Sequence, residues 1–420
     1  MSMLRSTVGE RLSGHTLAMR AIGIALLLLS CTAPSVVVPS PSTTATASSS
    51  PRPSASAAPS SRPDMTIAAA GEIRGDHALV LQVSQQPGGT TTAYRFWDVP
   101  LDGSATKLLL AYNRGEQLLT DFDYFDFSRQ LSPDERQLIL ADPVDIAGTG
   151  LLVVDLIAGT TRKIPIGGGA TQPAWSPDDQ VIAYRGFTIA GPFQKETGIW
   201  VVPASSGSAQ QVMTSDRPAG TGATSLYGWT EDGTGIAFAR DSSEVSVVEI
   251  ATGKITRVGG ATQGIAWRPK RPSVAMVIDE QERTPNAARV GHVEVRETTM
   301  AAPKTVARYG PGEGTFFLAP RWNPRSDEIL LLWAAGAGVL IRNELVVVDG
   351  VSAARRVLPT PATPRSAAWT ADGRRIVYGD LTAIRVMNAD GSDDHELFRP
   401  VLPAGAFQQF VSAVTAFAPR

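Results

Sequence analysis

Side chains that commonly perform chemistry are few in this sequence. Of its 420 residues one is cysteine, Cys31, and four are histidine, at positions 15, 77, 292 and 395. A single cysteine excludes an intrachain disulfide, a zinc site built on several cysteines and a CxxC redox pair. The sequence contains no G-x-S-x-G nucleophile motif, no H-E-x-x-H zinc motif and no G-x-x-x-x-G-K-[ST] phosphate-binding loop. We therefore expect no catalytic residue, no metal ligand and no cofactor.

Two weaker signals for metal chemistry have simpler interpretations. His395 and Glu396 are adjacent, but no second histidine stands at the spacing that a zinc site needs, which favours a solvated turn. Asp121, Asp123 and Asp126 could supply carboxylates to a cation such as Ca²⁺, although the glycine and the ligand spacing of an EF-hand loop are missing. A calcium site is a minor alternative.

The charge balance and the composition favour a turn-rich protein that does not bind nucleic acid. Lys and Arg number 38 against 40 Asp and Glu, a formal charge of -2, whereas a polyanion-binding surface needs clustered positive charge. The chain contains 39 Gly and 30 Pro, which indicates many short elements joined by tight turns. This composition is unlike that of a helical bundle.

The segment before Cys31 has the plan of a secretory signal peptide. Arg5, Arg11 and Arg20 precede the apolar residues 21–29, and a basic region followed by a short apolar core is typical of such peptides. As a helix, the apolar run would span only about 14 Å of a hydrocarbon core about 30 Å thick, which argues against a transmembrane anchor.

The four residues Leu28-Leu29-Ser30-Cys31 resemble the lipobox of bacterial lipoproteins. The resemblance implies that the thiol is diacylated and that the chain is cleaved before it, so that residues 1–31 form a signal peptide and Cys31 attaches the protein to a membrane. Met19 is an alternative start that keeps the basic and apolar parts. Ordinary secretion with an incidental cysteine is the alternative interpretation.

Residues 32–64 are expected to form a disordered tether. All but six of these residues are Ser, Thr, Pro or Ala, and such a segment cannot build an apolar core. It would hold the following domain, residues 65–420, away from the membrane surface. Ser and Thr beside Pro also permit O-glycosylation, and an unmodified linker is equally compatible with the composition.

One short pattern recurs through residues 65–420. W-S-P-D-D begins at Trp175 and W-T-A-D-G at Trp369, and each is followed at once by an apolar, β-rich run. The pattern predicts a hairpin whose first strand ends at a large apolar residue. We call these residues the anchors: Leu131, Trp175, Trp229, Trp267, Trp322 and Trp369, with steps of 44, 54, 38, 55 and 47 residues. This spacing suits the four-stranded blades of a β-propeller, with the anchors packed between blades rather than forming a ligand cage.

The two ends of the domain predict how the propeller closes. Phe417 repeats the anchor 48 residues after Trp369, but no blade follows it. Residues 77–83, 94–99 and 106–110 read as three strands of a blade that lacks its first strand. Pairing the two ends leaves no bare sheet edge. The prediction is an all-β, seven-bladed propeller closed by the C-terminal strand, with six or eight blades as alternatives because residues 66–70 could add a strand.

The W-S-P-D-G turn, the I-A-F/Y strand after it and the I-W-V third strand at residues 199–201 resemble the TolB-like propellers, relatives of the WD-repeat type. The resemblance covers most of residues 66–420 and implies the fold. Relatives include protein-binding envelope components, sugar lyases and the propeller halves of peptidases, so the resemblance does not fix a function.

Loop lengths predict which face of the propeller binds a partner. The loops between second and third strands and those between blades emerge on one face, and they include every long insertion: residues 85–92, 143–150, 186–197, 279–291 and 334–342, and 113–121, 214–224 and 309–315. Elaborate loops on a rigid scaffold commonly carry recognition. The candidate binding face comprises Asp123, Tyr124, Phe187, Phe193, Lys195, Glu196, Arg283, Tyr309 and Phe316. The alternative is that these side chains only pack the loops.

The sequence thus favours a monomeric lipoprotein on the extracytoplasmic face of a cell membrane, whose propeller binds a protein or glycan of the envelope. One alternative is a propeller enzyme, a lyase or hydrolase acting on envelope carbohydrate or peptide. Two or more titratable side chains that converge at the channel mouth would favour the enzyme. Another alternative is an accessory protein of a membrane sensor.

Overall fold

The computed structural model describes residues 65–417 except 72, 74–75, 86–90, 116–126, 142–149, 191–192, 206, 216–223, 241–243, 261, 281–290, 298–300, 310–315, 318–319, 336–341, 381 and 402–407. These residues belong to one compact unit, Ser60–Arg420. The predicted signal peptide, Cys31 and the tether lie outside them. In the described part of the chain, no helix is long and apolar enough to cross a membrane.

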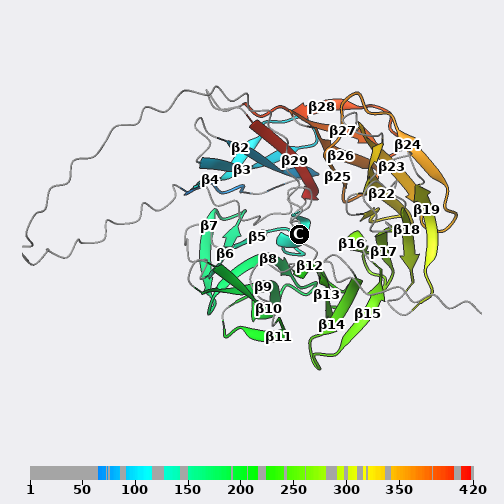
Figure 1. Cartoon of the computed structure of the whole chain (residues 1–420). Helices are drawn as coiled ribbons and strands as arrows, with labels where there is room; N and C mark the ends of the chain where they lie inside the picture. Colours follow the sequence, from blue (N-terminus) through cyan, green and yellow to red (C-terminus); the bar gives the residue numbers. More distant parts are fainter. Residues whose placement is uncertain are drawn as a thin grey trace, which may run out of the picture. The chain divides into compact units, whose positions relative to one another are not determined.

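The described residues form seven antiparallel sheets, which are the blades of a propeller (Figure 1). Blade 1 is made from both ends of the domain, in the order β1 (Met65–Ile67), β4 (Lys107–Gly115), β3 (Thr91–Pro100), β2 (His77–Gln85) and β29 (Gln408–Phe417). Blade 2 contains β5 (Gln137–Ala141), β6 (Gly150–Asp155) and β7 (Thr160–Pro165), preceded by the 3-10 turn η1 (Ser128–Gln130) and by an isolated bridge from Leu131 to Leu138.

Blades 3 to 7 follow in chain order. Blade 3 contains β8 (Gly169–Trp175), β9 (Val181–Ala190), β10 (Phe193–Pro203) and β11 (Gln210–Thr214). Blade 4 contains β12 (Thr224–Trp229), β13 (Gly235–Arg240), β14 (Glu244–Glu249) and β15 (Ile255–Gly259), and blade 5 contains β16 (Thr262–Trp267), β17 (Val274–Asp279), β18 (Gly291–Arg296) and β19 (Lys304–Tyr309).

In blade 6 the inner strand is split into β20 (Phe316–Phe317) and β21 (Arg321–Trp322), followed by β22 (Glu328–Ala335), β23 (Arg342–Asp349) and β24 (Arg355–Leu358). Blade 7 contains β25 (Ser366–Trp369), β26 (Arg375–Gly379), β27 (Ile384–Asn388) and β28 (His395–Phe398).

Seven apolar clusters join the blades into a ring. Each contains buried side chains of two successive blades, because strands buried on both sides carry apolar residues on both faces. The seventh cluster joins Val377 and Ile384 of blade 7 to Ala78 and Val99 of blade 1. The predicted all-β, seven-bladed propeller is therefore confirmed, and the six- and eight-bladed alternatives are excluded.

The C-terminal strand closes the ring, as predicted. β29 pairs with β2 from His77↔Phe417 to Gln85↔Gln408 and takes the inner position of blade 1. β1 pairs with β4 at the outer edge of the same blade, so the strand expected within residues 66–70 is Met65–Ile67 and belongs to blade 1 rather than to an eighth blade. Beyond β1, the amides of Ala70 and Gly71 donate to carbonyl groups of blade 2, at Leu156 (2.8 Å) and Ile157 (3.2 Å).

A shared set of hydrogen bonds shapes the turns between first and second strands. In four blades a hydroxyl directly after the anchor donates to the aspartate two residues later: Ser132–Asp134 at 2.5 Å, and Ser176–Asp178, Thr230–Asp232 and Thr370–Asp372 at 2.6 Å. The hydroxyl also accepts a main-chain amide from the start of the next strand. In five turns one residue adopts the left-handed conformation, with φ from 60 to 70°: Glu135, Asp179, Gly233, Lys270 and Gly373.

The anchors end the inner strands and contact the preceding blade. In four of them the indole Nε1 donates to the carbonyl of the residue just before the previous anchor: Trp175 to Gln130 (3.0 Å), Trp229 to Ala174 (3.0 Å), Trp322 to Ala266 (3.1 Å) and Trp369 to Arg321 (3.1 Å). Trp267 is the exception, because its Nε1 is buried without a hydrogen-bond partner. The equivalent acceptor residue, Gly228, has a φ of 107° and lies at a bulge between β12 and β13.

Candidate functional site

The predicted long-loop face coincides largely with residues outside the described ones. These are mainly the segments 86–90, 116–126, 142–149, 216–223, 281–290, 310–315 and 336–341. Asp123, Tyr124 and Arg283 fall within them, as do Asp121 and Asp126 of the possible calcium site. Among the described residues, no group of three or more His, Cys, Asp or Glu side chains is arranged to hold a metal ion.

One predicted loop, residues 186–197, is instead a paired hairpin. β9 and β10 continue to the pair Phe193↔Ala190, whereas the pairing of β8 with β9 reaches only Gly169↔Phe187. The end of the hairpin thus extends past the inner strand of its blade. Gly186, at the start of the predicted loop, makes room for packing, because a Cβ there would collide with the indole of Trp200.

The structure divides the remaining side chains of the candidate binding face into core and surface. Phe187 is 6% exposed and Tyr309 is 1% exposed, so both are core residues and offer no binding surface. Lys195 is exposed and Glu196 is half-buried, with Glu196 Oε2 accepting the amide of Thr224 at 3.1 Å. The other two, Phe193 and Phe316, lie at the first positions of β10 and β20.

Two arginines of the inner wall reach toward other blades. Arg321 of β21 donates from Nη1 to the hydroxyl of Ser128 in η1 at 2.9 Å, and blades 6 and 2 are not neighbours in the ring. Arg129 of η1 donates to the carbonyl of Leu226 in blade 4, with blade 3 between them. A guanidinium stays protonated at any accessible pH, so these groups can orient or bind an anion but cannot act as general bases.

The described histidines make contacts within the fold. His77 Nδ1 lies 2.5 Å from Asp98 Oδ1 between β2 and β3, and both residues are buried. His292 lies between Glu280 and Glu294, and the hydrogen bond with Glu294 is the largest of the effects that raise its pKa. His395 is exposed, as expected, but it is the first residue of the outer strand β28 rather than a turn residue, with Nδ1 2.9 Å from the carbonyl of Asp393.

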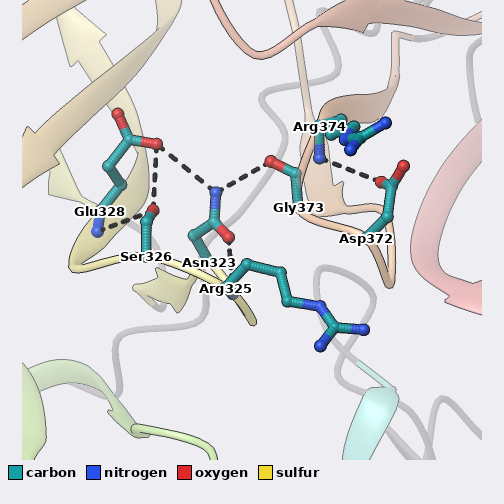
Figure 2. A pocket seen from close by; sticks show the side chains of 7 residues that line it. All are labelled: Asn323, Arg325, Ser326, Glu328, Asp372, Gly373 and Arg374. Carbon is teal, nitrogen blue, oxygen red and sulfur yellow. Dashed lines mark hydrogen bonds between the residues drawn. The ribbon is translucent and has the colours of Figure 1, made fainter.

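A pocket of about 680 Å³ lies between the first turns of blades 6 and 7, on the face opposite the long loops. Its lining residues are Asn323, Arg325, Ser326, Glu328, Asp372, Gly373 and Arg374 (Figure 2). Asn323 joins the two turns, because its Nδ2 donates to the carbonyl of Gly373 at 3.0 Å. Gly373 must be glycine here, since its φ is 68° and a Cβ would overlap the Asn323 side chain.

The two carboxylates of the pocket are held by neighbouring donors. Glu328 Oε1 accepts from Arg356 Nη1 at 2.6 Å, and Asp372 Oδ1 accepts from the Thr370 hydroxyl at 2.6 Å and the Arg374 amide at 3.0 Å. Burial acts to raise the pKa of Asp372, but these hydrogen bonds and the nearby arginines outweigh it and hold the pKa below its usual value. Asp372 is therefore ionised at neutral pH.

Loop length does not indicate this pocket, because two short turns line it. A usable signal was present, since blade 6 has Asn323 where four other blades have Ser or Thr. An amide side chain is longer than a hydroxyl and carries both donor and acceptor groups. It can therefore bridge to the next turn, which a hydroxyl that bonds within its own turn does not do.

Comparisons with known proteins do not assign the chain to a family. No protein-family model matches the chain, and no curated protein matches it. Among solved structures it is similar to TolB from Acinetobacter baumannii, with 14% identity over 81% of this chain and 66% of that one, and a TM-score of 0.41. A putative TolB from Agrobacterium tumefaciens has 14% identity over 81% and 99%, with a TM-score of 0.39. An oligogalacturonate lyase from Vibrio parahaemolyticus has 11% identity over 82% and 90%, with a TM-score of 0.48.

Proposed function

We propose that this protein is a lipid-anchored, extracytoplasmic binding module whose propeller recognises a protein or glycan of the cell envelope through its long-loop face. The observation that carries the proposal is the β9–β10 hairpin, which continues past the inner strand of blade 3. Backbone pairing fixes its conformation before any partner arrives, so binding costs less conformational entropy than ordering a free loop.

The charged groups on this hairpin support recognition of a polar partner. Lys195 is exposed, and Glu196 is oriented by the amide of Thr224. The same face carries the ends of two other long hairpins, at the pairs Gln85↔Thr92 and Ala335↔Arg342. Hairpin ends grouped on one side of a rigid ring form a broad surface suited to a macromolecule.

Site-specific photocrosslinking in the native envelope tests the binding face. A photoreactive amino acid at Lys195 is expected to give discrete adducts with one envelope protein or glycan. The matched control carries it at Val351, which is 62% exposed on the opposite face between β23 and β24. Equal adducts at both positions, or adducts only at Val351, would contradict the proposed face.

The membrane attachment rests on the sequence around Cys31 and is tested separately. The wild-type protein is expected in the membrane fraction, with a mass that includes the acyl groups. A Cys31→Ala variant should retain its signal peptide and gain no lipid mass. A processed, membrane-bound Cys31→Ala protein without lipid would rule out the lipoprotein assignment and leave the propeller's binding role open to its own test.

A further inference from the structure

The pocket between blades 6 and 7 presents two arginine side chains from different blades. Arg325 lies in the turn after β21, and Arg374 lies in the turn between β25 and β26. Both residues are exposed, and their main-chain amides are fixed by Asn323 Oδ1 at 2.8 Å and Asp372 Oδ1 at 3.0 Å. In the described part of the chain neither guanidinium has a hydrogen-bond or ion-pair partner, so the turns are fixed while the cationic groups are available.

The balance of charge in the pocket favours an anion. Glu328 is paired with Arg356 at 2.6 Å, so this carboxylate and guanidinium largely neutralise each other. Asp372 is held in its own turn by the Thr370 hydroxyl and the Arg374 amide. Among the remaining charged groups that line the pocket, two guanidinium groups, those of Arg325 and Arg374, outnumber one carboxylate, that of Asp372. A guanidinium binds carboxylate or phosphate oxygens through paired N–H groups, which makes it suited to oxyanions.

We infer that this pocket is a binding site for a small molecule that carries a carboxylate or phosphate group, held between Arg325 of blade 6 and Arg374 of blade 7. The volume of about 680 Å³ is in the range of small-molecule sites. The site lies on the face opposite the proposed partner-binding surface, so it is an additional function and does not depend on that proposal. A ligand that bridges the two turns would also brace the contact between these blades, which Asn323 and Gly373 make directly.

Calorimetric titration of the intact protein at low ionic strength tests the site with two probes, inorganic phosphate and citrate. We expect saturable binding at one site for at least one probe. Arg325→Gln and Arg374→Gln should each raise its dissociation constant about tenfold or more, the usual effect of removing a charged hydrogen-bond donor. Tighter binding of citrate would identify a carboxylate ligand, and tighter binding of phosphate a phosphorylated one.

Arg136→Gln is the matched control. Arg136 is exposed and stands five residues after the anchor Leu131, as Arg374 stands five after Trp369, but it does not line the pocket. Its substitution removes the same charge and should leave the dissociation constant unchanged. Absence of saturable binding of both probes, insensitivity to both pocket substitutions, or an equal effect of Arg136→Gln would each overturn the inference.

Hydrogen exchange measured by mass spectrometry locates the bound probe independently of affinity. With citrate or phosphate bound, amides of residues 323–328 and 370–375 should exchange more slowly, whereas residues 132–137 of blade 2 should be unaffected. Protection confined to other segments would place the anion elsewhere and refute the assignment. Arg325 and Arg374 are exposed and their guanidinium groups make no hydrogen bond or ion pair within the described fold, so both variants should unfold at the wild-type temperature.

Discussion

The hydrogen bond from each anchor tryptophan to the preceding blade can be isolated by comparing two equivalent substitutions. Trp229→Phe removes the indole N–H that donates to the carbonyl of Ala174 at 3.0 Å, and Ala174 is fully buried. Trp267→Phe is the same substitution in the next blade, where the indole N–H has no partner. The two variants differ in whether a hydrogen bond is lost, and Trp267 is also less buried than Trp229, so it loses less packing.

The expected magnitudes follow from this difference. Leaving a buried carbonyl without its donor costs about 1–3 kcal/mol. The smaller ring removes roughly 40 Å² of buried apolar area, about 1 kcal/mol at 25 cal/mol/Å². Trp229→Phe should therefore lower the free energy of unfolding by about 2–4 kcal/mol. In Trp267→Phe the loss of packing is offset by removal of an unpaired buried donor, so we expect a change within about 1 kcal/mol.

Equilibrium unfolding in urea, followed by far-ultraviolet circular dichroism, measures both changes on the same protein. A common slope of unfolding free energy with urea in all three proteins would show that they unfold from equivalent native states. Equal losses in the two variants, or a larger loss for Trp267→Phe, would show that the indole hydrogen bonds do not stabilise the contacts between blades.

Three further predictions concern closure of the ring and the turns. Truncation after residue 407 removes β29 and its pairing along β2, and should lower the unfolding free energy by several kcal/mol; an unchanged urea midpoint would mean that β29 does not close the ring. Asp179 adopts a left-handed φ of 63°, one of its carboxylate oxygens is buried without a partner, and burial together with the charges of Asp134 and Asp178 raises its pKa above 3.8. The penalty for ionising Asp179 in the folded protein is absent well below pH 3.8 and fully present above its folded pKa. Asp179→Gly should therefore raise the free energy of unfolding, and by more at pH 7 than at pH 3. A smaller increase at pH 7 would refute this electrostatic account. Gly373→Ala should lower the free energy of unfolding by about 2 kcal/mol or more, because a Cβ would overlap Asn323. Gly103 has a φ of 77° and open space around it, so Gly103→Ala should lower it by only about 1 kcal/mol. Equal losses in the two variants would leave no role for the contact with Asn323.

The repeated turn made the fold predictable from the sequence. An anchor followed by Ser or Thr and, two residues later, by aspartate encodes a local hydrogen-bond pattern that recurs at the spacing of a blade, so one motif predicted both the elements and their number. Phe417 and the blade without a first strand then gave the closure. The left-handed conformations of Asp179, where blades 4 and 7 have glycine, and of Lys270, one position earlier in its turn, were not predictable, because a non-glycine residue there is held by the surrounding turn.

The candidate sites were less predictable because they depend on contacts between distant segments. Residues 186–197 were predicted to form a loop, yet they belong to a paired hairpin in which Gly186 makes room for the ring of Trp200. Phe187 and Tyr309 looked available for binding until cross-strand packing buried them. The pocket between blades 6 and 7 arises from two turns about 50 residues apart, and no local pattern contains both.

The position of β1 determines how the domain responds to tension. A pull on the chain before Met65 first loads the three backbone pairs that join β1 to β4 at the outer edge of blade 1. Detaching β1 leaves the ladder from β4 to β29 intact, because the strand that closes the ring lies at the opposite, inner edge of that blade. Releasing residues 65–71, which also requires breaking the hydrogen bonds of Ala70 and Gly71 to blade 2, would add roughly 25 Å of extended chain. Under load, the chain that precedes the domain would therefore lengthen before the ring opens, and the loss of β1 would protect the ring from unfolding.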